Sequence, residues 1–292
     1  MKRMAWTLGL YLSLLLAGCI QDIILRPSLA DVGKPEDFGF TNYEEKMLPT
    51  PKEQQVSIFH IHSDQSKLLL VVVPGSDANK SFYTFALPYF VPYGVDMILM
   101  DYIGYGDSPG RKSFENLIDS TQGVIEYAVA QHQYVFALGE SIGTPTLIRV
   151  AADHPELSGV LLEGSVDPRY MPWAEAHSLF DGYISDPIVS VLELPFAAYA
   201  VAGTPTDMYS RDWIKKVTPP KFFIHSYQDE VTPYIGMMQI YEDAPDPKEL
   251  WTVWGHHCQI AKLIPDEYSA KLRGWMDSVI QNSNTGEVQN EQ

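Results

Sequence analysis

The chain has 292 residues, of which 46% are hydrophobic and 12% aromatic, and this is ample for one large globular core. The same composition excludes an intrinsically disordered chain. The formal net charge is −17 at pH 7, which argues against charge-driven binding to nucleic acid or anionic lipid and favours small uncharged or cationic partners.

The N-terminus has the layout of an export signal. Lys2 and Arg3 precede a short apolar stretch, which ends in the sequence LAGC at Cys19. These four residues resemble the bacterial lipobox, and the resemblance implies a signal peptide at residues 1–18, cleavage before Cys19 and lipid on its thiol. The alternative is an ordinary signal peptide or an uncleaved anchor, although the apolar stretch is short for a bilayer span of about 20 residues.

A lipid at Cys19 would tie the chain to the cell envelope. The next residue is Ile20 rather than aspartate, which in a Gram-negative cell usually goes with the outer membrane, facing the periplasm. Cys258 would then have no partner, so we expect no intramolecular disulfide. Residues 19–50 are rich in proline, glycine and charge and predict a tether, and the polar residues 282–292 predict a flexible tail.

Apolar runs and helical patterns alternate between tether and tail. Residues 55–62 show period-2 alternation and predict a half-exposed strand, with His60 and His62 as surface residues on one face. Residues 113–131 have apolar side chains at helical spacing, and Ser113 is a suitable N-terminal residue for this helix. Continuous apolar runs predict six strands buried on both faces, at residues 67–75, 95–104, 134–139, 158–164, 221–227 and 249–255.

Buried strands separated by helices predict an α/β domain over residues 51–281, with a doubly wound, mostly parallel sheet covered on both faces. Residues 168–217 break this rhythm, because they are rich in proline and aromatic residues and too long for one crossover. They predict an inserted, mostly helical cap over the C-terminal edge of the sheet, where ligands bind in such folds. Ordinary crossover helices with long loops are the alternative.

The sequence GESIG around Ser141 follows a buried strand and precedes a helical pattern. This strand–turn–helix setting is typical of a nucleophile elbow, whose sharp turn needs glycines because a side chain would clash with neighbouring backbone. The alternative is that Ser141 caps a helix. A serine nucleophile needs a base and an orienting acid, which in this kind of fold follow in the order Ser, acid, His.

Candidates for both partners follow the last two buried strands in that order. Asp229 comes just after the strand at 221–227, with Glu230 as a weaker rival and Glu163, after an earlier strand, weaker still. His256 and His257 come at the end of the strand at 249–255. Three groups at three strand ends in the expected order predict a catalytic triad.

These motifs together resemble the α/β-hydrolase superfamily, in its branch of small esterase-like and serine-aminopeptidase-like hydrolases. The resemblance covers about residues 56–279 apart from the cap. It implies a serine hydrolase that acts on an ester-like bond, a carboxylic ester or thioester, through an acyl-enzyme. It is carried by the sequences VVVPGSDAN, MDYIGYGDSPG, ALGESIG, YQDEVTP and GHHCQIAKLIPDEYSAKLRGWM.

The resemblance implies that Ser141 is the nucleophile, Asp229 the orienting acid and His257 the base. In this branch the catalytic histidine commonly lies about a dozen residues before a tyrosine, and Tyr268 lies eleven residues after His257. The glycine that precedes His256 favours that histidine instead, so the choice stays open, with His257 preferred.

The oxyanion hole departs from the family pattern at Pro74, which stands where a histidine is usual. The donors are backbone N–H groups, so the hole can survive this change. We assign them to Ser76 and Ile142, and Pro74 leaves the shape of the loop open.

No cofactor and no metal are implied. A zinc site built from His225, His256, His257 and Cys258 lacks the spacing of a known site, and GYGDSPG lacks the residues of a phosphate loop. We expect a monomer whose partner is a small-molecule acyl substrate. The alternatives are an acyltransferase or a peptidase with the same triad, or a non-catalytic envelope binding protein that keeps the fold.

Overall fold

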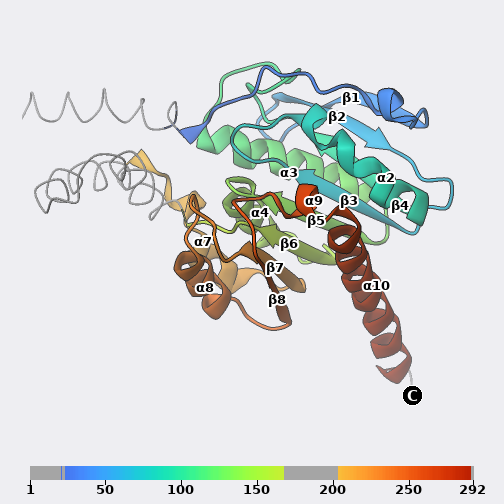
Figure 1. Ribbon diagram of the computed structural model, residues 1–292, viewed down its shortest axis with the longest axis vertical. Helices are drawn as coiled ribbons and strands as arrows, with labels where there is room; N and C mark the ends of the chain where they lie inside the picture. The colour runs from blue at the N-terminus through green and yellow to red at the C-terminus, as the bar shows by residue number, and fades with distance from the viewer. Residues whose placement is uncertain (1–20, 22–23, 168–202, 291–292) are drawn as a thin grey trace, which may run out of the picture.

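The computed structural model describes residues 21, 24–167 and 203–290 (Figure 1). The predicted signal peptide, Cys19 and most of the predicted cap lie outside these residues. The described part of the cap region, residues 203–217, forms short helical turns: η4 (Thr206–Met208), α7 (Ser210–Trp213) and η5 (Ile214–Lys216).

One eight-stranded sheet forms the centre of the fold, in the order β1-β2-β4-β3-β5-β6-β7-β8 (Figure 1). β2 pairs antiparallel with both β1 and β4, and all other neighbouring pairs are parallel. The predicted mostly parallel sheet is therefore confirmed. The strands are β1 (Tyr43–Pro49), β2 (Gln55–Ile61), β3 (Leu68–Val73), β4 (Val95–Met100), β5 (Val135–Glu140), β6 (Gly159–Glu163), β7 (Lys221–Ser226) and β8 (Lys248–Val253).

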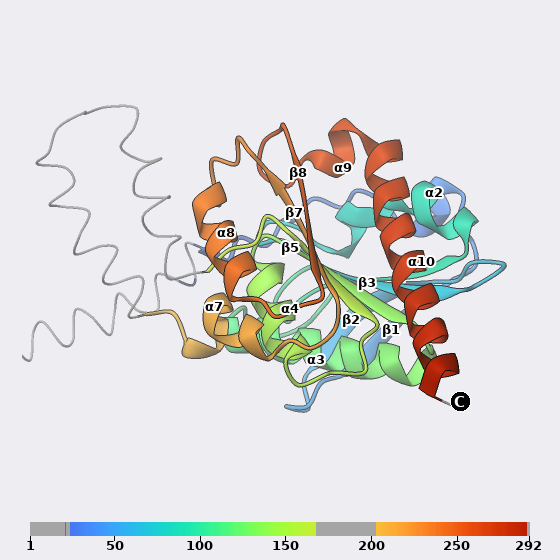
Figure 2. The same cartoon turned by 90° about the horizontal axis from the view of Figure 1, so that it is seen from below.

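Helices cover both faces of the sheet (Figure 2). One apolar core lies between the sheet and α3 (Phe114–Gln131), α4 (Gly143–Ala151) and α8 (Tyr234–Asp243). A second core lies under α2 (Leu87–Phe90), α9 (Ile260–Leu263) and α10 (Pro265–Asn290) on the other face. α3 begins as predicted, because the Ser113 hydroxyl accepts a hydrogen bond from the Asn116 amide at 3.1 Å. The remaining short turns are η1 (Pro35–Phe38), η2 (Lys80–Ala86) and η3 (Val91–Tyr93).

The predicted tether is part of the fold from residue 24 onward. Leu25 is fully buried, and its carbonyl accepts a hydrogen bond from the Lys112 ammonium at 2.7 Å. The amide of Arg26 donates to the Ser76 carbonyl at 3.0 Å. Farther along, β1 adds an edge strand to the sheet, so the domain begins well before residue 51.

Three other predictions differ from the structure. β8 lies at the edge of the sheet and has no buried residue, where the sequence predicts a strand buried on both faces. β2 is buried along nearly its whole length rather than half-exposed, because β1 and β4 flank it and α3 packs across it. His60 is consequently only 3% exposed and is not a surface residue. At the other end of the chain, α10 continues to Asn290, where the sequence predicts a flexible tail from residue 282.

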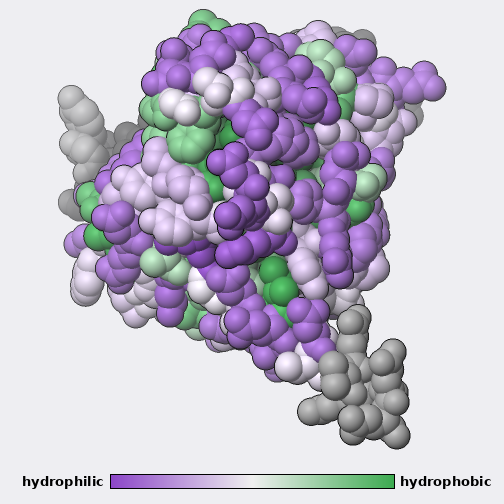
Figure 3. Space-filling view, turned by 90° about the vertical axis from the view of Figure 1, so that its right-hand side faces the viewer, coloured by the Kyte–Doolittle hydropathy of each residue, from purple (hydrophilic) through white to green (hydrophobic). Residues whose placement is uncertain are grey.

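The surface shown in Figure 3 is mainly hydrophilic, in keeping with the acidic composition. Among the described residues, no helix combines the length and the apolar character needed to cross a bilayer.

Candidate active site

Ser141 lies in a sharp turn between β5 and α4. Its φ is +52°, a left-handed conformation that residues other than glycine rarely adopt. A Cβ on Gly139 would lie 2.7 Å from the Gly143 carbonyl oxygen, and one on Gly143 would lie 2.4 Å from the Val73 carbonyl oxygen. Both glycines are therefore required by close backbone contact, as the sequence predicts, and the Ser141 amide is held by the Glu163 carbonyl at 2.9 Å.

The loops after β7 and β8 bring two further side chains to Ser141. The Nε2 atom of His257 lies 2.9 Å from the Ser141 Oγ atom. The Nδ1 atom of the same ring lies 2.8 Å from the Asp229 Oδ2 atom. Parallel strands end at one edge of a sheet, so residues 116 positions apart in the chain meet at that edge.

Asp229 is held as a buried, ionised carboxylate. Its Oδ1 atom accepts hydrogen bonds from the amides of Val231 at 3.0 Å and Thr232 at 2.7 Å, and its Oδ2 atom accepts one from the Thr232 hydroxyl at 2.8 Å. Burial by itself raises the pKa of Asp229, but the hydrogen bond from His257 and the bonds from Thr232 outweigh it and hold the pKa below its ordinary value. An ionised Asp229 accepts a hydrogen bond from the Nδ1–H group of His257, which leaves the Nε2 lone pair facing Ser141.

The rival residues lie elsewhere. The His256 side chain is 62% exposed, and its Nδ1 atom lies 3.3 Å from the carboxylate of Glu230, which is also exposed. Glu163 is buried, and its Oε2 atom accepts a hydrogen bond from the Tyr268 hydroxyl at 2.6 Å. His225 donates from Nε2 to the Thr232 carbonyl at 2.9 Å. Of the two adjacent histidines, the structure thus brings only His257 to Ser141.

The loop after β3 lies beside Ser141. A Cβ on Gly75 would lie 3.8 Å from the Ser141 Cβ atom. Among the described residues, the amides of Ser76 and Ile142, the predicted oxyanion donors, have no hydrogen-bond partner. They are thus free to donate to a substrate oxygen.

Side chains and the N-terminal segment fix the shape of this loop despite Pro74. The Tyr102 hydroxyl donates to the Pro74 carbonyl at 2.9 Å, and the Tyr105 hydroxyl donates to the Ser76 carbonyl at 3.1 Å. The Tyr83 hydroxyl accepts from the Gly75 amide at 3.0 Å. The Arg26 amide adds the bond to the Ser76 carbonyl described above.

A pair of neighbouring carboxyl groups next to Ser141, of which Glu163 is buried and Glu140 partly buried, is not evident from the sequence. Glu140, next to Ser141, stands opposite Glu163 in the register of β5 and β6. Desolvation raises the pKa of both side chains, and Tyr268 donates its hydroxyl hydrogen to Glu163. The only sequence signal was the position of each glutamate at a strand end.

Cys258 also adjoins the triad, with its Sγ atom 3.5 Å from the His257 Nε2 atom. Desolvation and the neighbouring carboxyl groups raise the pKa of this thiol well above its ordinary value, so it stays protonated at neutral pH. It is therefore a poor competitor to Ser141 as a nucleophile.

A family model described as serine aminopeptidase, S33, matches residues 64–212, just over half of the chain. The chain belongs to this S33 family, within the α/β hydrolases. Its class is therefore hydrolase.

A bacterial and a human protein resemble this S33-family chain. It is 24% identical over 225 residues to the uncharacterized protein YfhR of Salmonella typhimurium, with 69% of this chain and 73% of that protein covered. It is 28% identical over 193 residues to the human alpha/beta hydrolase domain-containing protein 17C, with 63% of this chain and 50% of that protein covered.

Solved esterases share the fold of this S33-family chain. An esterase from Pyrococcus furiosus aligns with a TM-score of 0.72 and 16% identity over 87% of this chain and 97% of its own. An esterase from Exiguobacterium antarcticum aligns with a TM-score of 0.60 and 17% identity, over 80% of this chain and 100% of its own. At these identities the likeness shows the fold alone, and it confirms the predicted α/β-hydrolase fold.

Proposed function

We propose that the chain is a serine hydrolase that cleaves an ester-like bond, a carboxylic ester or thioester, through an acyl-enzyme on Ser141. The supporting observation is the pair of hydrogen bonds that links Ser141 through His257 to Asp229, at 2.9 and 2.8 Å. Each distance is within hydrogen-bond reach, which a nucleophile, its base and the orienter of that base require.

In the proposed reaction the Ser141 Oγ atom attacks the carbonyl carbon of the substrate while His257 Nε2 takes the hydroxyl proton. Asp229 holds the ring and stabilises the imidazolium that forms. The carbonyl oxygen becomes an oxyanion, to which the amides of Ser76 and Ile142 donate. His257 then protonates the leaving alcohol or thiol, and the acyl group stays on Ser141.

Deacylation repeats these steps with water. His257 removes a proton from a water molecule, whose oxygen attacks the acyl carbon and forms a second oxyanion. Collapse releases the carboxylic acid, and His257 returns its proton to Ser141. No step uses Cys258, whose raised thiol pKa disfavours the thiolate.

The first experiment tests the nucleophile. Wild-type protein incubated with a fluorophosphonate probe should carry one adduct, and mass spectrometry should place it on the peptide containing Ser141. The Ser141→Ala variant should not be labelled. Labelling that persists in Ser141→Ala would mean that another residue is the nucleophile.

The second experiment tests the bond cleaved. The solved neighbours are named esterases, whereas the family name refers to an aminopeptidase. Turnover of p-nitrophenyl acetate and of an aminoacyl p-nitroanilide should be compared at equal enzyme concentration, with Ser141→Ala as the blank. We expect hydrolysis of the ester. Efficient hydrolysis of the anilide with little ester cleavage would favour the peptidase.

A further inference from the structure

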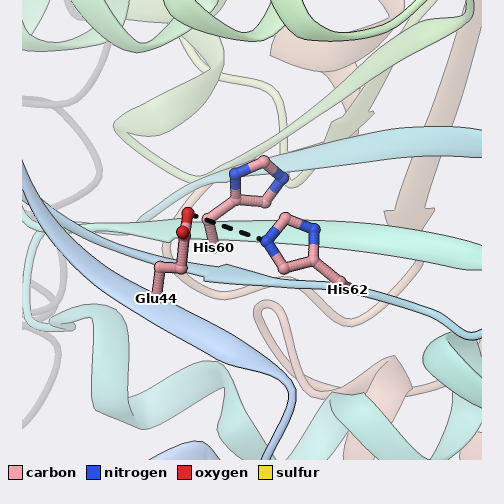
Figure 4. Close-up of side chains that lie close together, drawn as sticks. All are labelled: Glu44, His60 and His62. Atoms are coloured by element: carbon pink, nitrogen blue, oxygen red, sulfur yellow. Dashed lines mark ion pairs between the residues drawn. The ribbon is translucent and has the colours of Figure 1, made fainter.

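A cluster of Glu44, His60 and His62 lies on β1 and β2, at the opposite edge of the sheet from β7 and β8 (Figure 4). Neither the proposed reaction nor the oxyanion hole uses any of these residues. We call them the edge cluster.

Strand geometry brings the three side chains together. Glu44 stands directly opposite His60 in the antiparallel register of β1 and β2. His60 and His62 are two positions apart on β2, so they project from the same face. Their ring centroids are 4.2 Å apart, and His62 Nε2 lies 3.8 Å from Glu44 Oε2. One nitrogen or oxygen atom from each of the three residues lies within 4.8 Å of those of the others.

His60 has an unsatisfied atom within this cluster. The side chain is buried, yet its Nε2 atom has no hydrogen-bond partner. Buried polar atoms without a partner are rare in native proteins and call for an explanation. The other nitrogen, Nδ1, lies 3.1 Å from the Tyr127 hydroxyl on α3. With the ring proton on Nδ1, the Nε2 lone pair is free to bind a ligand.

We propose that the edge cluster binds a divalent transition-metal ion, for which zinc is the best match. Two imidazole nitrogens and one carboxylate oxygen are ligands that zinc accepts, and a fourth position can be taken by water. Water has access, because His62 also lines a surface cavity of about 650 Å³. The contact of His60 with Tyr127 resembles the outer contacts that orient metal-bound histidines.

Two charged side chains lie next to the edge cluster: Lys46, which competes with a metal ion for Glu44, and Asp96, which lies near His62. The Lys46 ammonium lies 2.5 Å from Glu44 Oε2, so an incoming ion must displace it from that oxygen. Asp96 Oδ2, which lies 3.1 Å from His132 Nε2, is 3.7 Å from His62 Nδ1 and would have to move closer to fix the orientation of this ring. Small movements of the half-exposed Glu44 and His62 side chains would bring their ligand atoms to about 2.0–2.2 Å from an ion. A bound ion would fasten the edge strand β1 to β2.

The test is zinc titration of the full-length protein after chelator treatment, followed by calorimetry. We expect one saturable zinc ion per chain and a rise in melting temperature on adding zinc. His62→Ala and Glu44→Gln should each weaken binding at least tenfold. Lys46→Met should tighten binding, because it frees the Glu44 carboxylate. Cobalt substituted for zinc should give visible absorption bands that His62→Ala removes.

The matched control is His256→Ala, which removes an exposed histidine that also lies beside a glutamate. This variant should bind zinc like the wild type. The proposal is overturned if wild type shows no saturable binding, if His62→Ala and Glu44→Gln bind as tightly as wild type, or if His256→Ala abolishes binding. Circular dichroism of each variant separates loss of the site from loss of the fold.

Discussion

His256 and His257 follow each other in the chain but face different surroundings. His257 points inward to Ser141 and Asp229, whereas His256 is exposed beside Glu230. We predict that His257→Ala lowers ester turnover about as much as Ser141→Ala does, by roughly 10⁴-fold or more, because the two residues act as one unit.

The matched variant is His256→Ala, which should retain turnover close to that of the wild type. Rates are best measured on a small activated ester, so that differences in the binding of a larger substrate do not affect the comparison. If His256→Ala is the inactive variant, the assignment of the base is wrong. If both variants remain active, no histidine base operates and the proposed mechanism fails.

Glu163 provides a prediction about pH and stability. Burial raises the pKa of its carboxyl group in the folded protein, so the folded state binds this proton more tightly than the unfolded state does. Tighter proton binding by Glu163 stabilises the folded state. This contribution is fully present at pH values below the unfolded pKa of about 4.3, and it is lost as pH rises through the raised folded pKa. Glu163→Gln should therefore lose less unfolding free energy between pH 5 and pH 8 than wild type, by on the order of 1–2 kcal/mol.

Urea unfolding at the two pH values measures this difference. Glutamine keeps an oxygen that can accept the Tyr268 hydrogen bond, so the variant should fold. The control is Glu230→Gln, which changes an exposed carboxylate and should follow the wild-type pH dependence. Identical pH dependence in wild type and Glu163→Gln would show that Glu163 titrates normally in the fold.

At the scale of elements, the turn between β5 and α4 depends on contact with the end of β3. A methyl group on Gly143 would approach the carbonyl oxygens of Val73 and Pro74 to 2.4 and 2.8 Å. Both are backbone atoms, so β3 or α4 must shift. We predict that Gly143→Ala costs about 1–3 kcal/mol of unfolding free energy. It should also slow probe labelling of Ser141, because the shift moves the loop after β3, which carries the proposed oxyanion donor Ser76.

Gly274→Ala is the matched control for this variant. Gly274 lies within α10, where an added methyl group would meet no atom within 4 Å. The change should leave labelling unchanged and stabilise the protein by up to about 1 kcal/mol, because alanine favours helix. Equal labelling rates in the two variants would show that the close contact at Gly143 does not position the site.

The sequence predicts strands best where both faces of the strand are buried. All six continuous apolar runs form strands. Five of them, β3 to β7, are buried along their length, because a strand covered on both faces leaves a run that no surface residue interrupts. Two-sided burial was wrongly predicted for the sixth, β8, because it lies at the edge of the sheet. β1 is not predicted, because it is an edge strand whose Glu44, Glu45 and Lys46 resemble a solvated linker. Half-exposure was wrongly predicted for β2, since its polar residues His60 and Ser57 are buried against neighbouring elements.

The candidate site was predictable to the level of motifs. Ser141 and Asp229 follow from strand ends and turn glycines, because these local features determine where each side chain lies. The choice between the two histidines depends on loop torsions, about which the sequence is informative only through resemblance, and there the choice stayed open with His257 preferred. The contact of Glu163 with Tyr268 joins residues 105 positions apart and has no local signal.

At the scale of the whole molecule, the N-terminal cysteine provides a further prediction. Cys19 lies outside the described residues, and its lipidation is our proposal from the LAGC sequence. Cells grown with labelled palmitate should label the wild-type protein and not Cys19→Ser. Cys19→Ser should also leave the membrane fraction for the soluble one. A Cys19→Ser protein that stays fully membrane-bound would show that the apolar segment itself is the anchor.

The burial of Leu25 and the bond from Arg26 to Ser76 set a geometric limit on where such an enzyme works. Cys19 and Leu25 are only six positions apart, and even a fully extended chain of that length spans at most about 20 Å. A lipidated protein would thus be held close to the bilayer. The loop after β3, whose Ser76 carbonyl is bonded to the Arg26 amide, would lie on the side of the domain where the anchored segment attaches. Substrates presented at the membrane surface would reach Ser141 more readily than those arriving from the far side of the domain.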